Sequence, residues 1–247
     1  MANPLLNDRA FQRAEQYAQA GTGEVMSVEG AINKTALLLL LVVAGATWVW
    51  TRYFQAQDPA VIMPYLLGGV FGGLAAAVAT IFVPRWARIT APIYAAAEGL
   101  ALGGISAFYE QQLHGIVFQA IGLTFGVLAV MLVLYHSGVI KVTDRFRMVV
   151  VAATGGIALF YLVTIVLGFF HVSVPLLYGG GTGAIVFSLV VVAIAALNLA
   201  LDFDFISRGA AGGAPKFMEW YAAFGLMVTL IWLYLEILRL LGNVRRR

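Results

Sequence analysis

The sequence contains no cysteine and few charged residues. Without cysteine there is no disulfide framework, no thiolate nucleophile and no cysteine-ligated metal or iron–sulfur site. Charged residues make up 11% of the 247 residues, less than half of the roughly 25% found in a soluble domain. Because 62% of the residues are hydrophobic, the chain cannot cover a water-facing surface of its own size. The composition excludes an ordinary soluble enzyme, a disordered chain and a coiled coil, and predicts an integral membrane protein.

The apolar residues form long, continuous runs. A membrane-spanning helix needs about 20 such residues to cross a hydrocarbon core about 30 Å thick. Continuous runs exclude a β-barrel, whose strands alternate apolar and polar residues. We therefore predict an all-α, polytopic membrane protein with a bundle of seven transmembrane helices. The seven runs are residues 33–51, 61–83, 89–109, 115–136, 147–170, 182–203 and 220–241.

Polar segments flank these runs. Residues 1–30 are predicted to form a polar cytoplasmic tail, with a short helix over 7–19. Residues 31–242 form the seven-helix domain and residues 243–247 a basic C-terminal tail. The tail lacks the basic segment and short apolar stretch of a signal peptide, so none is expected to be cleaved.

Lysine and arginine are unevenly divided between the two ends of the predicted helices. Ten lie on the side of the N-terminal tail and five on the opposite side. The positive-inside rule then predicts a cell-membrane protein with its N-terminus in the cytoplasm and its C-terminus outside. The basic residues Arg245–Arg247 oppose this orientation, and if they determine it, one run must be re-entrant. The formal charge of +3 predicts orientation in a membrane rather than binding to nucleic acid.

Glycines recur at a spacing of four residues. Such pairs let helix backbones approach each other closely in lipid, and they predict tight packing of the bundle. The pairs are Gly68/Gly72, Gly69/Gly73 and Gly99/Gly103.

Acidic residues at the ends of the last two runs are the main candidates for function, because an unpaired charge in a membrane costs several kcal/mol. Asp202 and Asp204 close the sixth run, and Glu219 opens the seventh. Two antiparallel helices would place them at a similar depth. Carboxylates held together repel and share a proton, as in a pH sensor or a cation site. The alternative is a solvated acidic loop at the membrane surface.

Within this cluster Asp202 is the better candidate for an inward-facing group. Asp202 and Asp204 are separated by about 200° around a helix and cannot face the same partner. Asn198 lies one turn before Asp202 on the same face and is a supporting polar group. Arg85 and Arg88 are expected on the same side of the membrane, where they could neutralise the acids.

Two further acids interrupt the apolar runs. Glu98 lies near the middle of the third run, and Glu236 lies toward the outer end of the seventh. With the inner cluster they would form a ladder of carboxylates, which suits cations. The alternatives are a hydrogen-bonded structural acid for Glu98 and an ion pair with Arg239, three residues on, for Glu236.

Enzyme signatures are absent from the sequence. The histidines lie at the ends of different runs, and there is no H-E-x-x-H motif and no nucleophile elbow. The lysines also lie at the ends of runs, which excludes a retinal Schiff base inside the bundle. We expect no enzymatic activity, no cofactor and no tightly bound metal.

Five segments carry a resemblance to a known family: Glu98–Gly103, Lys141–Arg147, Gly183–Leu189, Leu201–Ile206 and Leu233–Gly242. Together they resemble the Bax inhibitor superfamily, in its bacterial Bax-inhibitor-like branch. The resemblance implies a seven-helix bundle with one central helix, and a pH-regulated calcium leak. It also implies that an Asp of the sixth helix shares a proton with an Asp of the seventh near the cytoplasmic end, and that an Arg from the second helix region can lock them.

The resemblance assigns some of these roles to residues of this chain. Asp202 matches the sixth-helix motif D-x-x-x-I, and Arg85 resembles the lock arginine by its context. The acid of the seventh helix has three candidates. The family's motif L-Y-L-D-[FI] gives Glu236, where this chain departs by having Glu in place of Asp. The closing L-R-x-x-G puts Thr229 at the acid position, and the geometry of the loop gives Glu219.

The sequence therefore predicts a pH-gated leak channel or slow transporter, with calcium or another cation as the transported ion and the lipid bilayer as its surroundings. The alternative is a membrane-embedded interaction protein that modulates a membrane protein or protease partner and has no ion path of its own.

Overall fold

A computed structural model describes residues 24–170 and 181–246. Within these ranges seven helices are long and apolar enough to cross a membrane, and no β-strand is present beyond one isolated bridge. This confirms the predicted all-α, seven-helix architecture. The helices are α2 (Val28–Ala56), α3 (Met63–Phe82), α4 (Ala87–Gln112), α5 (Ile116–His136), α6 (Asp144–Phe169), α8 (Thr182–Ala211) and α9 (Met218–Arg245). Two short 3-10 helices, η1 (Pro59–Val61) and η2 (Pro84–Trp86), precede α3 and α4. The predicted helix over 7–19 lies outside the described residues.

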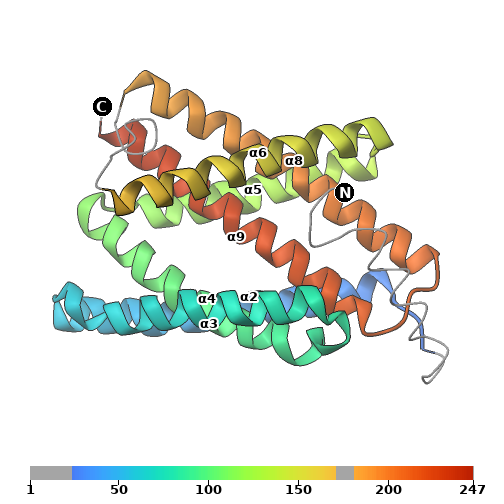
Figure 1. The fold of residues 1–247 in the computed structure, drawn as a ribbon, viewed down its shortest axis with the longest axis horizontal. Coiled ribbons are helices and arrows are strands. Elements are labelled where there is room, and N and C mark those ends of the chain that lie inside the picture. The colour runs from blue at the N-terminus through green and yellow to red at the C-terminus, as the bar shows by residue number, and fades with distance from the viewer. Residues whose placement is uncertain (1–23, 171–180, 247) are drawn as a thin grey trace. The chain divides into compact units, whose positions relative to one another are not determined.

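The chain divides into two units. The first unit contains α2, α3 and α4 together with residues 205–227, which are the end of α8 and the start of α9. The second unit contains α5 and α6 with the described parts of 115–204 and 228–247. In the first unit, α4 packs along both α2 and α3, and the three helices lie side by side in Figure 1.

Glycine contacts explain the close packing of α4 in the first unit. A side chain at Gly99 would bring its Cβ to 2.5 Å from the carbonyl oxygen of Val42 on α2, and Gly103 would meet Ala46 at the same distance. Gly69 of α3 is equally close to the backbone of α4. The pair Gly99/Gly103 therefore packs as predicted. Gly68 differs, because nothing lies within 4 Å of its Cβ position.

The second unit holds α6 against α8 by polar and aromatic contacts. Asn198 donates to the hydroxyl of Thr154 at 2.8 Å, and the rings of Phe160 and Phe187 lie 5.0 Å apart. Only 11% of the span in α6 is buried. Apolar side chains that remain exposed on a membrane-spanning helix contact lipid.

The sixth helix is longer than predicted. Its apolar run ends at residue 203, but α8 continues to Ala211. Asp202 and Asp204 are thus not at the end of the helix, as the sequence predicted, but nine and seven residues before it. Hydropathy falls at the first charged residues, whereas the backbone hydrogen bonds of the helix do not depend on side-chain polarity.

Glycines end α8. Gly213 has a φ of +67°, a conformation that costs a residue with a side chain about 1 kcal/mol or more. The N–H of Ala214 donates to the carbonyl of Gly209 at 3.0 Å, and that of Gly213 donates to Ala210 at 3.2 Å. This pair of bonds is a Schellman motif, which satisfies carbonyls left open at a helix end. It fixes the direction in which the chain leaves α8 toward α9.

Candidate functional site

Acidic side chains are buried in the last two helices. Asp202 and Glu219 are 0% exposed and Glu236 is 1% exposed. Charged residues inside membrane-spanning segments are costly and mark functional sites. The surroundings of each acid decide what it can do.

Asp202 lies on the buried face of α8, as predicted. Asn198, one turn earlier, is 2% exposed, and its amide also donates to the carbonyl of Ile194 at 2.9 Å. The adjacent Leu199 and Leu201 are buried as well. Asp202 is therefore a carboxyl group placed on the buried face of a spanning helix, next to a buried amide.

Asp204 faces a different direction and has a basic partner. The guanidinium of Arg147, at the start of α6, donates to Asp204 Oδ2 at 3.0 Å. Arg147 also lies 3.8 Å from Asp144. That Asp202 and Asp204 face different partners stays a prediction. Arg147 was missed as a partner, although its position in the loop on the same predicted side was a usable signal.

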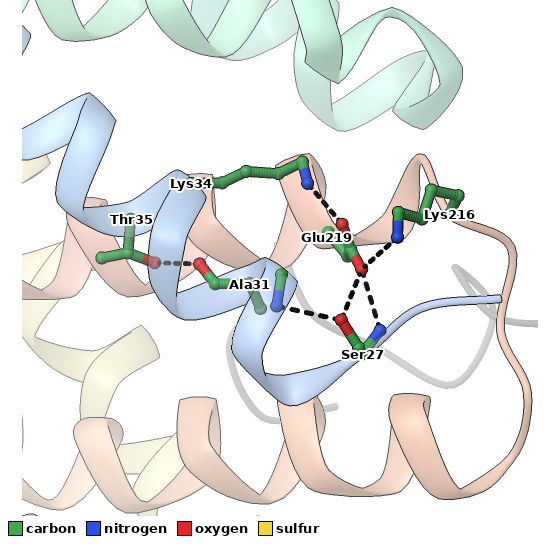
Figure 2. A network of polar contacts seen from close by, with 7 residues as sticks. Ser27, Ala31, Lys34, Thr35, Lys216 and Glu219 are labelled. Atoms are coloured by element: carbon green, nitrogen blue, oxygen red, sulfur yellow. Dashed lines mark hydrogen bonds and ion pairs between the residues drawn. The ribbon is translucent and has the colours of Figure 1, made fainter. Parts of the chain in front are cut away.

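Glu219, at the start of α9, is surrounded by hydrogen-bond donors from the first unit (Figure 2). The N–H and the hydroxyl of Ser27 donate to Oε1 at 2.9 Å and 3.0 Å. The ammonium group of Lys34 pairs with Oε2, and that of Lys216 lies 3.5 Å from Oε1. An ionised carboxylate is purely an acceptor, so this set of donors suits the charged form.

The cluster around Glu219 depends on a missing side chain. A Cβ at Gly30 would overlap the carboxyl group of Glu219. The same turn carries the cap of α2, because Ser27 Oγ accepts from the N–H of Gly30 at 2.9 Å. Ser27 and Lys34 were not recognised from the sequence. Their signals were a capping serine before an apolar run and a lone lysine at the start of that run.

Asp202 belongs to the second unit and Glu219 to the first. The predicted sharing of a proton between them therefore stays a prediction, and so does the lock by Arg85 and Arg88. Both arginines are exposed, Arg85 in η2 and Arg88 at the start of α4. Neither forms an ion pair with another residue in the ranges that the structure describes.

Glu236 of α9 forms the ion pair with Arg239 that the sequence offered as an alternative. The distance from Arg239 to Glu236 Oε2 is 3.1 Å. The hydroxyl of Tyr161 donates to Oε1 at 2.7 Å and the indole of Trp232 at 3.2 Å. Arg239 also donates to the Tyr161 oxygen and lies 4.9 Å over its ring. The carboxylate is thereby neutralised and held within the second unit.

Glu98 faces α3 from the middle of α4. A Cβ at Gly73 would lie 3.0 Å from Glu98 Oε2 and 3.8 Å from the ring of Tyr94. Glu98 is half-buried. The absence of a side chain at Gly73 leaves the room that the carboxyl group fills. The ladder that would join Glu98 to the acids of the second unit stays a prediction.

In the part of the chain that the structure describes, seven helices are long and apolar enough to span a membrane, and the last two carry buried carboxyl groups. These features define a polytopic, multi-pass membrane protein in contact with lipid. The family model described as Bax inhibitor 1 like matches residues 3–246. The chain therefore belongs to the Bax inhibitor 1-like family, and the resemblance found in the sequence is confirmed. A search of curated proteins found no match.

Proposed function

We propose that the protein is a pH-regulated cation leak of the cell membrane, with calcium as the transported ion. One observation carries the proposal: Asp202 places a carboxyl group at 0% exposure inside a membrane-spanning helix. In such surroundings the gain or loss of one proton changes the local electrostatic energy far more than it would in water. The family resemblance, which implies a calcium leak, supports the same function.

The family resemblance, which assigns the shared proton to the Asp of the sixth helix, favours Asp202 as the proton-binding group, and the other buried acids have contacts of their own. Glu219 forms ion pairs with two ammonium groups and accepts from Ser27, and Glu236 accepts from Arg239, Tyr161 and Trp232. Groups held in this way serve best as fixed charges. In the proposed mechanism, protonation of Asp202 changes how α8 packs and so alters the leak.

The orientation and the class of activity are part of the proposal. We infer that the N-terminus lies in the cytoplasm, because lysine and arginine are twice as numerous on that side. We also infer that the protein is not an enzyme, because its sequence offers no pair of nucleophile and base.

Calcium flux into proteoliposomes of the purified protein tests the proposal. The expected result is a leak above that of empty liposomes, with a rate that changes between about pH 6 and about pH 8 because a buried carboxyl can titrate there. Absence of flux at every pH, with the protein shown to be folded, would overturn the proposal. The alternative, an interaction protein without an ion path, would then be tested by crosslinking in membranes for a consistent protein partner.

A further inference from the structure

The chain that enters α2 lies against the connection between α8 and α9. The N–H of Met26 donates to the carbonyl of Ala214 at 2.6 Å, and the N–H of Lys216 donates to Glu24 at 3.1 Å. Val25 and Pro215 form the antiparallel bridge between these two bonds. We call residues 24–27 the strap, since they cross the connection before α2 begins.

One carboxylate fastens the strap at its end. Glu219 accepts hydrogen bonds from both the N–H and the hydroxyl of Ser27, the last residue of the strap (Figure 2). Glu219 is fully buried, and Lys34, on the second turn of α2, has a side chain only 18% exposed. Lys216 is the weaker cation, because it lies farther away, at 3.5 Å, and is 48% exposed.

Lys34 stabilises the carboxylate of Glu219 more than Lys216 does. A buried carboxylate that loses its closest basic partner is strongly destabilised, whereas an exposed ion pair contributes little. Lys34 also lies 5.5 Å over the ring of Trp220, the residue after Glu219. Lys34 thus contacts two consecutive side chains at the start of α9.

We propose that Lys34 and Glu219 form the latch of the strap, and that the closed strap restrains the connection between α8 and α9 and keeps the leak low. The second half of this statement rests on the proposed function. The connection is short and begins with Gly212 and Gly213, so release of the strap gives it freedom to move. Asp202 lies nine residues before the end of α8, or about 14 Å along the helix. A movement at the connection therefore acts on the helix that carries the proposed sensor.

Hydrogen exchange tests the latch without any ion flux. In Lys34→Met we expect the amides of Met26 and Lys216 to exchange about tenfold faster than in the parent protein, since local opening exposes them. Lys216→Met is the matched control and should change the exchange of Met26 much less. Equal exchange of Met26 in the parent protein and in Lys34→Met would overturn the latch.

A reversible crosslink tests the effect on the leak. The bridge between Val25 and Pro215 lies between two hydrogen bonds, in the class of antiparallel pair with Cα atoms about 4.5 Å apart. That separation suits a disulfide, and the sequence has no other cysteine to compete. The variant Val25→Cys/Pro215→Cys should therefore leak less when oxidised than when reduced, at one fixed pH.

The two experiments separate the possible failures. Equal leak in the oxidised and reduced states, with the disulfide verified and the parent protein leaking, would overturn control by the strap. If the parent protein itself does not leak, the proposed function fails, and hydrogen exchange alone decides whether Lys34 and Glu219 latch the strap. Because both redox states are the same protein, a folding defect cannot account for a difference between them.

Discussion

At the scale of single residues, Glu219 and Glu236 have a role that differs from the one proposed for Asp202. Glu219 and Glu236 have basic partners within their own units, and Asp202 lies on the buried face of α8 beside Asn198. A carboxylate that already has a cation and further donors is a fixed element of the structure. Glu219 and Glu236 are therefore anchoring acids of their units.

Gly30 provides a direct test of the space occupied by Glu219. Gly30→Ala places a methyl group where the carboxyl group lies, and overpacking of this kind costs about 1–3 kcal/mol. Gly68→Ala is the matched control, because its Cβ meets nothing within 4 Å. We expect unfolding in detergent to show a loss of stability for Gly30→Ala only. Similar stability of the two variants would contradict the placement of Glu219.

The cluster at Glu236 is tested by a double-mutant cycle. Arg239→Met leaves a buried carboxylate without its cation, and we expect a loss of about 3–5 kcal/mol in the free energy of unfolding. In the double variant Glu236→Gln/Arg239→Met the loss should be smaller than the sum of the single losses, because the charge is gone too. Additive losses would show that the two residues are not coupled.

At the scale of elements, the sequence was sufficient to predict which segments form helices but not where each helix ends. Each predicted run corresponds to one helix, because about 20 apolar residues have one stable form in lipid. The end of α8 was predicted eight residues too early, since hydropathy falls at Asp202 while the helix continues to Ala211. Hydropathy indicates whether a segment lies in lipid, whereas the capping residues determine where its helix ends.

Gly213 determines where α8 stops, and its replacement tests that role. Gly213→Ala must adopt a φ of +67° with a side chain, which costs about 1–2 kcal/mol. Gly213→Asn should cost less, because asparagine tolerates this conformation. Thermal unfolding in detergent should place Gly213→Asn between the parent protein and Gly213→Ala. If alanine were as stable as glycine, the cap would not depend on the backbone conformation at this position.

The candidate site was only partly predictable, for a reason that particular residues show. The burial of Asp202 beside Asn198 followed from helical periodicity within one element. The contact of Lys34 with Glu219 joins residues 185 positions apart, and the contact of Arg147 with Asp204 joins residues 57 positions apart. No local pattern encodes such pairs, because they depend on how the helices pack.

At the scale of the whole molecule, orientation in the membrane is the main prediction. Because the sequence has no cysteine, single cysteines can be labelled without background. Asp58→Cys and Arg246→Cys should react with a membrane-impermeant maleimide on intact cells, and Lys141→Cys should not. All three positions are exposed. Labelling of Lys141→Cys with protection of Asp58→Cys would reverse the orientation.

The central claim is that the proton on Asp202 controls the leak. The most direct measurement compares the pH dependence of calcium flux in proteoliposomes of Asp202→Asn and of Asp204→Asn. Both variants remove one carboxylate from α8; Asp202 is 0% exposed, and the side chain of Asp204 is 14% exposed and lies 3.0 Å from Arg147. We expect that Asp202→Asn loses the pH response and that Asp204→Asn keeps it. An unchanged pH response in Asp202→Asn would contradict the account.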